Sequence, residues 1–371
     1  MEAVSSSFTP ERLIFARNRE GLTQTRLADL ADVSPRSIAH YEGGDHVPSE
    51  DVVARLAKTL KVPVSFFGAP PLDVIEPEAA SFRALSKMSA LKRNAALTSG
   101  ALAMQLNEWL EERLRLPTTD VPSYERGARD PESSARRVRN EWELGFAKIP
   151  NVVHLVEAHG ARVFSLPEHL VDIDAFSFWW KNTPYILLNT RKSTERGRFD
   201  AAHELGHLVM HGDYDLPRGR EREHEANRFA AAFLMPEEGV LASGLRNAGV
   251  ERVLESKERW GVSATALAHR LHELGLTSDW TYHSTLRRLS QLGYRSGEPD
   301  EGGGPRERSQ ALEKAFALLK QRGLRQPDVA RELHVHPETL RALLFGLVLT
   351  PMDGEAASVS GRGDLHAVGE G

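Results

Sequence analysis

Apolar and polar residues alternate in this chain with two different periods, and the periods predict its elements. Helical spacing of apolar positions dominates, and a strand-like pattern of β-branched and aromatic residues appears only between residues 160 and 189. Helices are therefore predicted over residues 8–68 in short pieces, then over 82–116, 131–142 and 151–159, and again from Phe199 onward. Three short strands are predicted at 161–166, 175–180 and 185–189.

These elements predict a mainly α (α+β) fold built from several parts. We expect an N-terminal five-helix-type helix-turn-helix domain, a second domain with a small three-stranded sheet, and a helical C-terminal region. The predicted boundaries are 8–68 for the first domain, 69–130 for a helical connection, 131–295 for the second domain, 306–350 for the C-terminal helices and 351–371 for a disordered tail.

The composition excludes several kinds of catalytic and metal site but says little about the fold. The 371 residues are 40% hydrophobic, carry a net charge of -5 and include no cysteine. Thiolate metal sites, cysteine nucleophiles and disulfides are therefore excluded, and a metal would have to be bound by His, Asp or Glu. No apolar run is long enough to span a membrane and no secretory signal is evident, so a cytoplasmic protein without membrane contact is expected.

The sequence His203-Glu-Leu-Gly-His207 carries the strongest chemical signal. Two histidines four residues apart share one face of a helix, where both imidazoles can bind a single Zn²⁺. Glu204 lies between them and is predicted to be the catalytic general base, which takes a proton from the attacking water. This short motif also occurs by chance in helices. However, its apolar flanks predict a buried helix, and burying two histidines and a glutamate is costly unless they are paired or bound to metal.

A catalytic zinc site usually has three protein ligands, so a third must come from elsewhere. Helical spacing over the segment 223–236 places Glu223 and Asn227 on one face, one turn apart. We predict that Glu223 is the third ligand and that Asn227 supports a ligand histidine by a hydrogen bond. Glu225 points about 200° away and would be the ligand only in another helical register. His211 and His224 are both candidate oxyanion stabilisers, and their spacing does not choose between them.

Residues 23–42 predict a second function. Thr23 and Ser34-Pro35 are typical helix starts, and Leu27, Ala28, Ile38 and Tyr41 would pack the two helices together. This is the two-helix unit that places a recognition helix in the major groove. The predicted DNA-binding residues are Gln24, Thr25, Ser34, Arg36, Ser37 and His40.

The charge of this domain leaves a second interpretation open. Basic and acidic residues are equal in number between Phe8 and Gly68, whereas DNA-binding domains are usually basic. A helical protein-interaction module would fit as well. DNA binding would require phosphate contacts from locally placed cations, for which Arg17, Arg19, Arg26 and Arg36 are the candidates.

In the C-terminal stretch 328–346, helix-capping and turn residues are spaced much as in the N-terminal helix-turn-helix. Its second helix is dominated by Leu340, Leu343, Leu344 and Phe345. We interpret that apolar surface as part of a core or a dimer contact, and the stretch as structural.

Taken together, these motifs resemble two known families. Leu22-Thr-Gln-Thr-Arg-Leu-Ala, Val33-Ser and Tyr41-Glu-Gly resemble the Xre/Cro/C1-type helix-turn-helix. Arg198-Phe-Asp-Ala-Ala-His-Glu-Leu-Gly-His, Glu225-Ala-Asn-Arg-Phe-Ala and Phe233-Leu-Met-Pro resemble the ImmA/IrrE zinc metallopeptidases. The resemblance implies a zincin-like fold, with His203, His207 and Glu223 at the ligand positions and Glu204 at the catalytic position. The departures are Asp32 in place of the usual turn glycine and the fusion of the two modules.

The predicted function is a DNA-binding transcriptional regulator fused to a zinc endopeptidase. The resemblance implies that its substrate is an Xre-type repressor or antitoxin, and that cleavage controls stress-response, mobile-element or toxin-antitoxin genes. The expected partners are operator DNA and that protein substrate, with a homodimer left open. The alternative is a non-proteolytic transcription factor or antitoxin with a structural or ligand-sensing zinc site.

Overall fold

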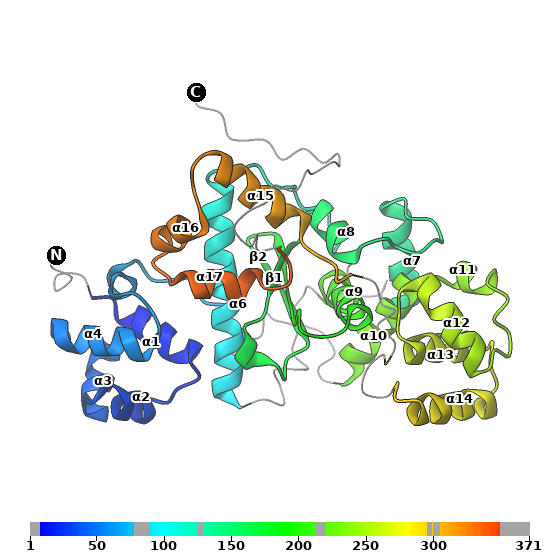
Figure 1. Cartoon of the computed structure of the whole chain (residues 1–371), viewed down its shortest axis with the longest axis horizontal. Helices are drawn as coiled ribbons and strands as arrows, with labels where there is room; N and C mark the ends of the chain where they lie inside the picture. The colour runs from blue at the N-terminus through cyan, green and yellow to red at the C-terminus, as the bar shows by residue number, and fades with distance from the viewer. Residues whose placement is uncertain are drawn as a thin grey trace. The chain divides into compact units, whose positions relative to one another are not determined.

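A computed structural model describes residues 8–77, 89–124, 130–211, 220–294, 299 and 305–348. The chain divides into two compact units, and Figure 1 shows its helices and strands. Unit 1 comprises residues 1–116, 164–173 and 311–371, and unit 2 comprises residues 117–163 and 174–310. The predicted domain boundaries remain a prediction.

Unit 1 begins with a bundle of short helices that follow their capping signals. They are α1 (Pro10–Arg19), α2 (Gln24–Ala31), α3 (Pro35–Gly43), α4 (Glu50–Thr59) and a 3₁₀ turn at Val64–Gly68. Thr23 caps α2 and Ser34 caps α3 through their side-chain oxygens. Asp32 adopts the left-handed conformation between them, with φ 52°. Leu13, Leu27, Ile38, Leu56 and Phe66 are fully buried in the core.

The rest of unit 1 is also helical. The long helix α6 (Ala90–Glu111) contacts α1, and the last helices are α15 (Gln310–Gln321), α16 (Gln326–Glu332) and α17 (Pro337–Leu344). Ser89 caps α6, and the start predicted at Phe82 lies outside the described residues. The predicted end at Leu116 was too late, because α6 ends at Glu111. A 3₁₀ turn at Glu168–Leu170 completes the unit.

Unit 2 combines helices with the small sheet, except for residues 164–165 of the first strand, which belong to unit 1. Its helices are α7 (Pro131–Glu141), α8 (Val152–Ala158), α9 (Thr194–Met210), α10 (Arg220–Leu234), α11 (Glu237–Leu241), α12 (Val250–Trp260), α13 (Ala264–Glu273) and α14 (Asp279–Gln291). The start of α9 was predicted too late, at Phe199, because the hydroxyl of Ser193 caps the helix five residues earlier.

The sheet lies where the sequence predicted it. Its strands are β1 (Arg162–Ser165), β2 (Ala175–Trp180) and β3 (Thr183–Leu188), in the order β1-β3-β2. The strands β2 and β3 form an antiparallel hairpin in which Ala175 pairs with Leu188 and Trp180 with Thr183. Lys181 and Asn182 close it with positive φ angles of 46° and 63°, as a tight two-residue hairpin turn requires. The predicted fold class is therefore confirmed.

Close packing of α9 on α10 depends on Gly206. A Cβ atom at this position would lie 2.9 Å from the Phe229 ring, so only glycine fits without a shift of α10. Both β2 and β3 pack against α9 on the sheet side. Across the described residues, no helix has both the length and the apolar character needed to cross a membrane.

Candidate metal centre

Three potential metal ligands converge between α9 and α10. The two imidazoles come from His203 and His207, one turn apart on α9, and the carboxylate comes from Glu223 in the first turn of α10. One ligand atom from each residue lies within 4.8 Å of the other two. The Nε2 atoms of the histidines are 3.1 Å apart, and each is 3.4 Å from a carboxylate oxygen of Glu223.

These distances suit a tetrahedral zinc ion. Zinc–nitrogen and zinc–oxygen distances of about 2.0–2.2 Å place neighbouring tetrahedral ligands roughly 3.3–3.5 Å apart. The three measured separations nearly match one triangular face of such a tetrahedron. Two imidazoles and one carboxylate are also a donor set that zinc uses in catalytic sites. The residues present therefore fit the metal that the sequence predicted.

Hydrogen bonds on the far side of each imidazole leave Nε2 available as a ligand atom. His203 Nδ1 lies 3.0 Å from Asn227 Oδ1, which can only accept, so Nδ1 carries the proton. His207 Nδ1 lies 3.0 Å from His211 Nδ1, and His211 Nε2 lies 2.8 Å from Glu225 Oε2. We call Glu225, His211 and His207 the histidine chain.

The histidine chain has one consistent proton arrangement. The Glu225 carboxylate accepts from His211 Nε2–H, which leaves His211 Nδ1 as an acceptor. His207 Nδ1–H must then donate to it, and His207 Nε2 keeps its lone pair on the side of Glu223. The side chain of His211 is fully buried, so no solvent competes for its two hydrogen bonds.

Burial and local charge set the protonation of the three ligands. Burial lowers the pKa of His207 to about 4, so this ring is neutral at pH 7. Burial alone would raise the pKa of Glu223, but hydrogen bonds from His203 and His207 outweigh it and hold that pKa far below the usual range. Burial likewise favours neutral His203, but the Glu223 hydrogen bond and the charges of Glu204 and Glu223 raise its pKa above 6.5. A proton on His203 therefore occupies the place that a metal would take.

Glu204 points to the sheet side of α9. Its side chain is buried, and its Oε2 accepts a 2.7 Å hydrogen bond from the hydroxyl of Ser177. Ser177 lies on β2, at the edge of the described sheet. Ser177 was not predicted as a site residue, although a hydroxyl within the run Phe176-Ser-Phe178 was a signal that one face of this strand meets a polar partner.

The other candidate residues lie away from the convergent ligand atoms or face other partners. His224 is exposed, and Glu221 is exposed as well. Both ring nitrogens of His211 are engaged in the histidine chain, which places it behind His207 rather than at an oxyanion position. The carboxylate of Glu225 faces His211 and not the two Nε2 atoms.

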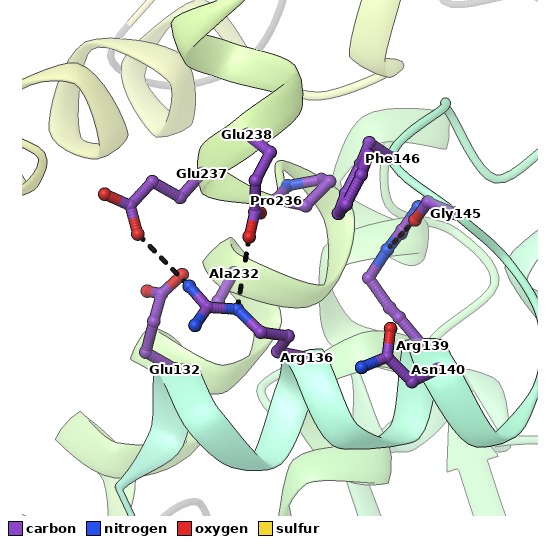
Figure 2. Close-up of a pocket in the computed structure, with 10 residues that line it drawn as sticks. All are labelled: Glu132, Arg136, Arg139, Asn140, Gly145, Phe146, Ala232, Pro236, Glu237 and Glu238. Atoms are coloured by element: carbon purple, nitrogen blue, oxygen red, sulfur yellow. Dashed lines mark hydrogen bonds and ion pairs between the residues drawn. The ribbon is translucent and has the colours of Figure 1, made fainter.

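A separate surface pocket lies between α7 and α11 (Figure 2) and shares no lining residue with the ligand triad. Its charged groups satisfy one another. Arg136 pairs with Glu237 at 3.2 Å and Glu238 at 3.3 Å. Arg139 donates to the carbonyl oxygens of Gly145, Ala147 and Phe233. We interpret this pocket as structural, because its cations are already bound by the protein.

The predicted DNA-binding residues lie at the starts of α2 and α3 and along α3. Gln24, Thr25, Ser34 and Arg36 are exposed, and Ser37 and His40 are half-buried. Arg36 Nε donates to His40 Nε2 at 3.2 Å, and the amide of Gln24 donates to Glu42 at 2.7 Å.

Two of the predicted phosphate contacts were wrong. The guanidinium of Arg17 pairs with both carboxylate oxygens of Glu42, at 2.5 and 3.0 Å. Arg19 is buried and donates to the carbonyl oxygens of Leu60 and Lys61. Both cations therefore stabilise the helix bundle. Their role was mispredicted because capping residues and helical periodicity do not show where a long side chain ends.

Comparisons with known proteins agree with this architecture. Residues 12–65 match a helix-turn-helix domain, and residues 156–272 match the IrrE N-terminal-like domain. The "Radiation response metalloprotease IrrE" of Deinococcus radiodurans is 32% identical over 122 residues, which are 28% of this chain and 37% of that protein. The protein of the same name from Deinococcus deserti is 32% identical over 147 residues, 36% of this chain and 50% of that protein. The chain thus spans half the length of these relatives or less.

Fold, site and matches define a metallopeptidase-type domain that follows a DNA-binding helix-turn-helix domain. Over residues 156–272 the chain is similar to the IrrE metalloproteases, and the predicted resemblance to the ImmA/IrrE family with an N-terminal helix-turn-helix is confirmed.

Proposed function

We propose that this protein is a zinc-dependent endopeptidase that hydrolyses a peptide bond in a partner gene regulator, and that its helix-turn-helix domain brings it to DNA. One observation carries the peptidase proposal. The triad of His203, His207 and Glu223 has the spacing of a zinc site, and the carboxylate of Glu204 follows the first ligand directly in α9. A purely structural site would need no general base beside it.

The residues around the triad have distinct proposed roles. When bound, zinc would polarise the scissile carbonyl and acidify the attacking water. Glu204 accepts the proton of that water and delivers it to the leaving amide nitrogen. Ser177 holds the Glu204 carboxylate in place through the 2.7 Å hydrogen bond. Asn227 and the histidine chain fix the two imidazoles.

An extended peptide is the substrate class that the surroundings favour. The strand β2 lies at the edge of the described sheet, and its Ser177 touches Glu204. A peptide that added to this edge as a further strand would pass beside the general base. Fusion to a DNA-binding domain raises the effective concentration of the peptidase near other proteins on the same promoter. An Xre-type repressor or antitoxin, or a second copy of this chain, is therefore the proposed substrate.

The experiment uses Glu204→Gln as a substrate trap. This variant keeps the three proposed ligands and removes the base, so it should bind its partner without cutting it. Proteins that it retains are identified and then incubated with the zinc-loaded wild type. Fragments that form with the wild type and not with Glu204→Gln support the proposal. Retained proteins that stay intact under any metal loading would favour the non-proteolytic alternative, a transcription factor or antitoxin whose zinc is structural or senses a ligand.

The DNA-binding proposal needs its own measurement. Arg36→Ala and His40→Ala remove groups from α3 that are predicted to contact the duplex, and operator affinity should fall in both variants. Lys58→Ala on α4 removes an exposed charge from the same domain and serves as the control. Equal affinities in all three variants would refute the assignment of α3 as the recognition helix.

A further inference from the structure

The last three helices of the chain repeat the first three at a constant offset of 302 residues. Gly21 corresponds to Gly323, Asp32 to His334 and Gly44 to Gly346. Identical residues occur at eight pairs in this alignment: Glu11 and Glu313, Gly21 and Gly323, Leu22 and Leu324, Gln24 and Gln326, Ala28 and Ala330, Val33 and Val335, Pro35 and Pro337, and Gly44 and Gly346.

The backbone conformation of the first copy also recurs in the second. The three left-handed positions have φ angles of 62°, 52° and 75° in the first copy and 81°, 55° and 71° in the second. The same hydrogen bonds close the helix ends. Val33 N–H donates to the carbonyl of Ala28 at 3.0 Å, and Val335 N–H donates to that of Ala330 at 2.9 Å. The turn between α16 and α17 is therefore the turn of the N-terminal helix-turn-helix.

Corresponding positions of the two copies are buried alike. Leu27, Ala28 and Ile38 are buried in the first copy, and their counterparts Val329, Ala330 and Leu340 are buried in the second. Leu343 and Leu344 are also buried, so the leucines that suggested a core role do lie in the core of unit 1. They do not occupy the outer face of α17, and they do not decide what that face binds.

The outer face of α17 is as open as that of α3. Arg36 and Ala39 are exposed on α3, and their counterparts Glu338 and Arg341 are exposed on α17. This face therefore carries Arg341 and the hydroxyl residue Thr339, which corresponds to Ser37. In addition, Gln326 begins α16 as Gln24 begins α2.

Charge favours DNA as the occupant of this face. Between Gln310 and Val348 there are six Lys/Arg residues and four Asp/Glu residues, whereas the corresponding residues 8–46 of the first copy include five Lys/Arg and six Asp/Glu. The exposed cations of the second copy are Lys320, Arg322, Arg325, Arg331 and Arg341. A helix-turn-helix fold with a basic surface is the usual signature of a duplex-binding unit. We propose that α15, α16 and α17 form a second helix-turn-helix unit that binds double-stranded DNA.

The second unit would read different bases from the first. Glu338 occupies the place of Arg36 and pairs with Arg341 at 2.7 Å. A carboxylate cannot contact guanine as arginine does, but it accepts from the amino group of cytosine. Phosphate contacts then have to come from Arg341 and the cations of α15 and α16, which predicts binding with a strong salt dependence.

The test measures binding of the full-length protein to a fluorescein-labelled 30-base-pair duplex of mixed sequence over a series of salt concentrations. Arg341→Glu should raise Kd about tenfold at low salt and make the slope of log K against log salt shallower by about one. Arg341→Lys keeps the point charge and should retain the wild-type slope. Arg287→Glu, an exposed arginine on α14 in unit 2, is the matched charge control.

Two results would overturn the proposal. One is an Arg341→Glu variant whose Kd and salt slope equal those of Arg287→Glu. The other is an Arg341→Glu variant with unchanged DNA binding and an altered mass in analytical ultracentrifugation, which would make α17 a protein contact. Combining Arg341→Glu with Arg36→Ala separates the two units. The losses should multiply if both bind the duplex, and Arg36→Ala alone should account for the whole loss if only the first does.

Discussion

The histidine chain predicts that a residue outside the ligand triad controls metal affinity. Glu225 accepts a 2.8 Å hydrogen bond from His211 Nε2, and His211 in turn contacts His207. Glu225→Gln keeps the shape of the side chain and an oxygen that can accept, but removes the negative charge. A charge-assisted hydrogen bond contributes about 1.5–3 kcal/mol, and the neutral bond left behind about half of that.

The expected loss of affinity follows from these values. About 1.4 kcal/mol corresponds to tenfold, so Glu225→Gln should weaken zinc binding roughly tenfold. Glu225→Ala should weaken it about 100-fold, the upper end for partners that orient a ligand, because His211 Nε2–H is then left without a partner in a buried position. Glu223→Ala should lose more than either variant, since it removes a proposed ligand.

Competition with a chromophoric chelator at pH 7.4 measures these affinities. Glu221→Gln is the control, because it makes the same chemical change at an exposed position of the same helix. Circular dichroism of the metal-free proteins checks that each variant folds. If both Glu225 variants bind zinc as tightly as Glu221→Gln, the proposed role of the histidine chain is refuted. If Glu225→Ala loses zinc while Glu223→Ala keeps it, the ligand assignment is reversed.

Three further predictions concern α9 and its neighbours. Gly206→Val should destabilise the protein by about 1–3 kcal/mol in urea unfolding and weaken zinc binding, because its side chain would collide with Phe229; unchanged stability would refute the packing argument. Ser177→Ala should slow cleavage about tenfold and leave zinc affinity unchanged, since it frees the Glu204 carboxylate; a loss of zinc instead would make Ser177 a structural residue. Zinc binding should weaken as pH falls through the raised pKa of His203, because zinc and the proton compete for this ring; chelator competition over a pH series measures the affinity, and an affinity that does not depend on pH would contradict this prediction.

Local patterns predicted the parts of the site that lie on single helices. The spacing of His203 and His207 and that of Glu223 and Asn227 each follow from one helical turn. The short strands were evident from their aromatic and β-branched runs. Capping residues predicted the starts of α2 and α3.

Contacts between elements could not be predicted in the same way. Ser177 meets Glu204 only because β2 packs on α9, and Glu225 meets His211 only because α10 lies in one register against α9. The partners of the Arg17 and Arg19 guanidinium groups were mispredicted for the same reason, since long side chains reach partners that helical spacing does not reveal. In the C-terminal helices, the apolar pattern indicated a core or a dimer contact for the leucines, but it did not show what the outer face of α17 exposes.

Peptide-bond hydrolysis by Glu204 is the central claim, and intact-mass measurement tests it most directly. A partner retained by Glu204→Gln is incubated with the zinc-loaded wild type and, separately, with the zinc-loaded variant. The prediction is that the wild type alone yields two fragments whose masses sum to that of the partner plus one water. An unchanged partner mass with the wild type, or the same fragments with Glu204→Gln, would contradict it.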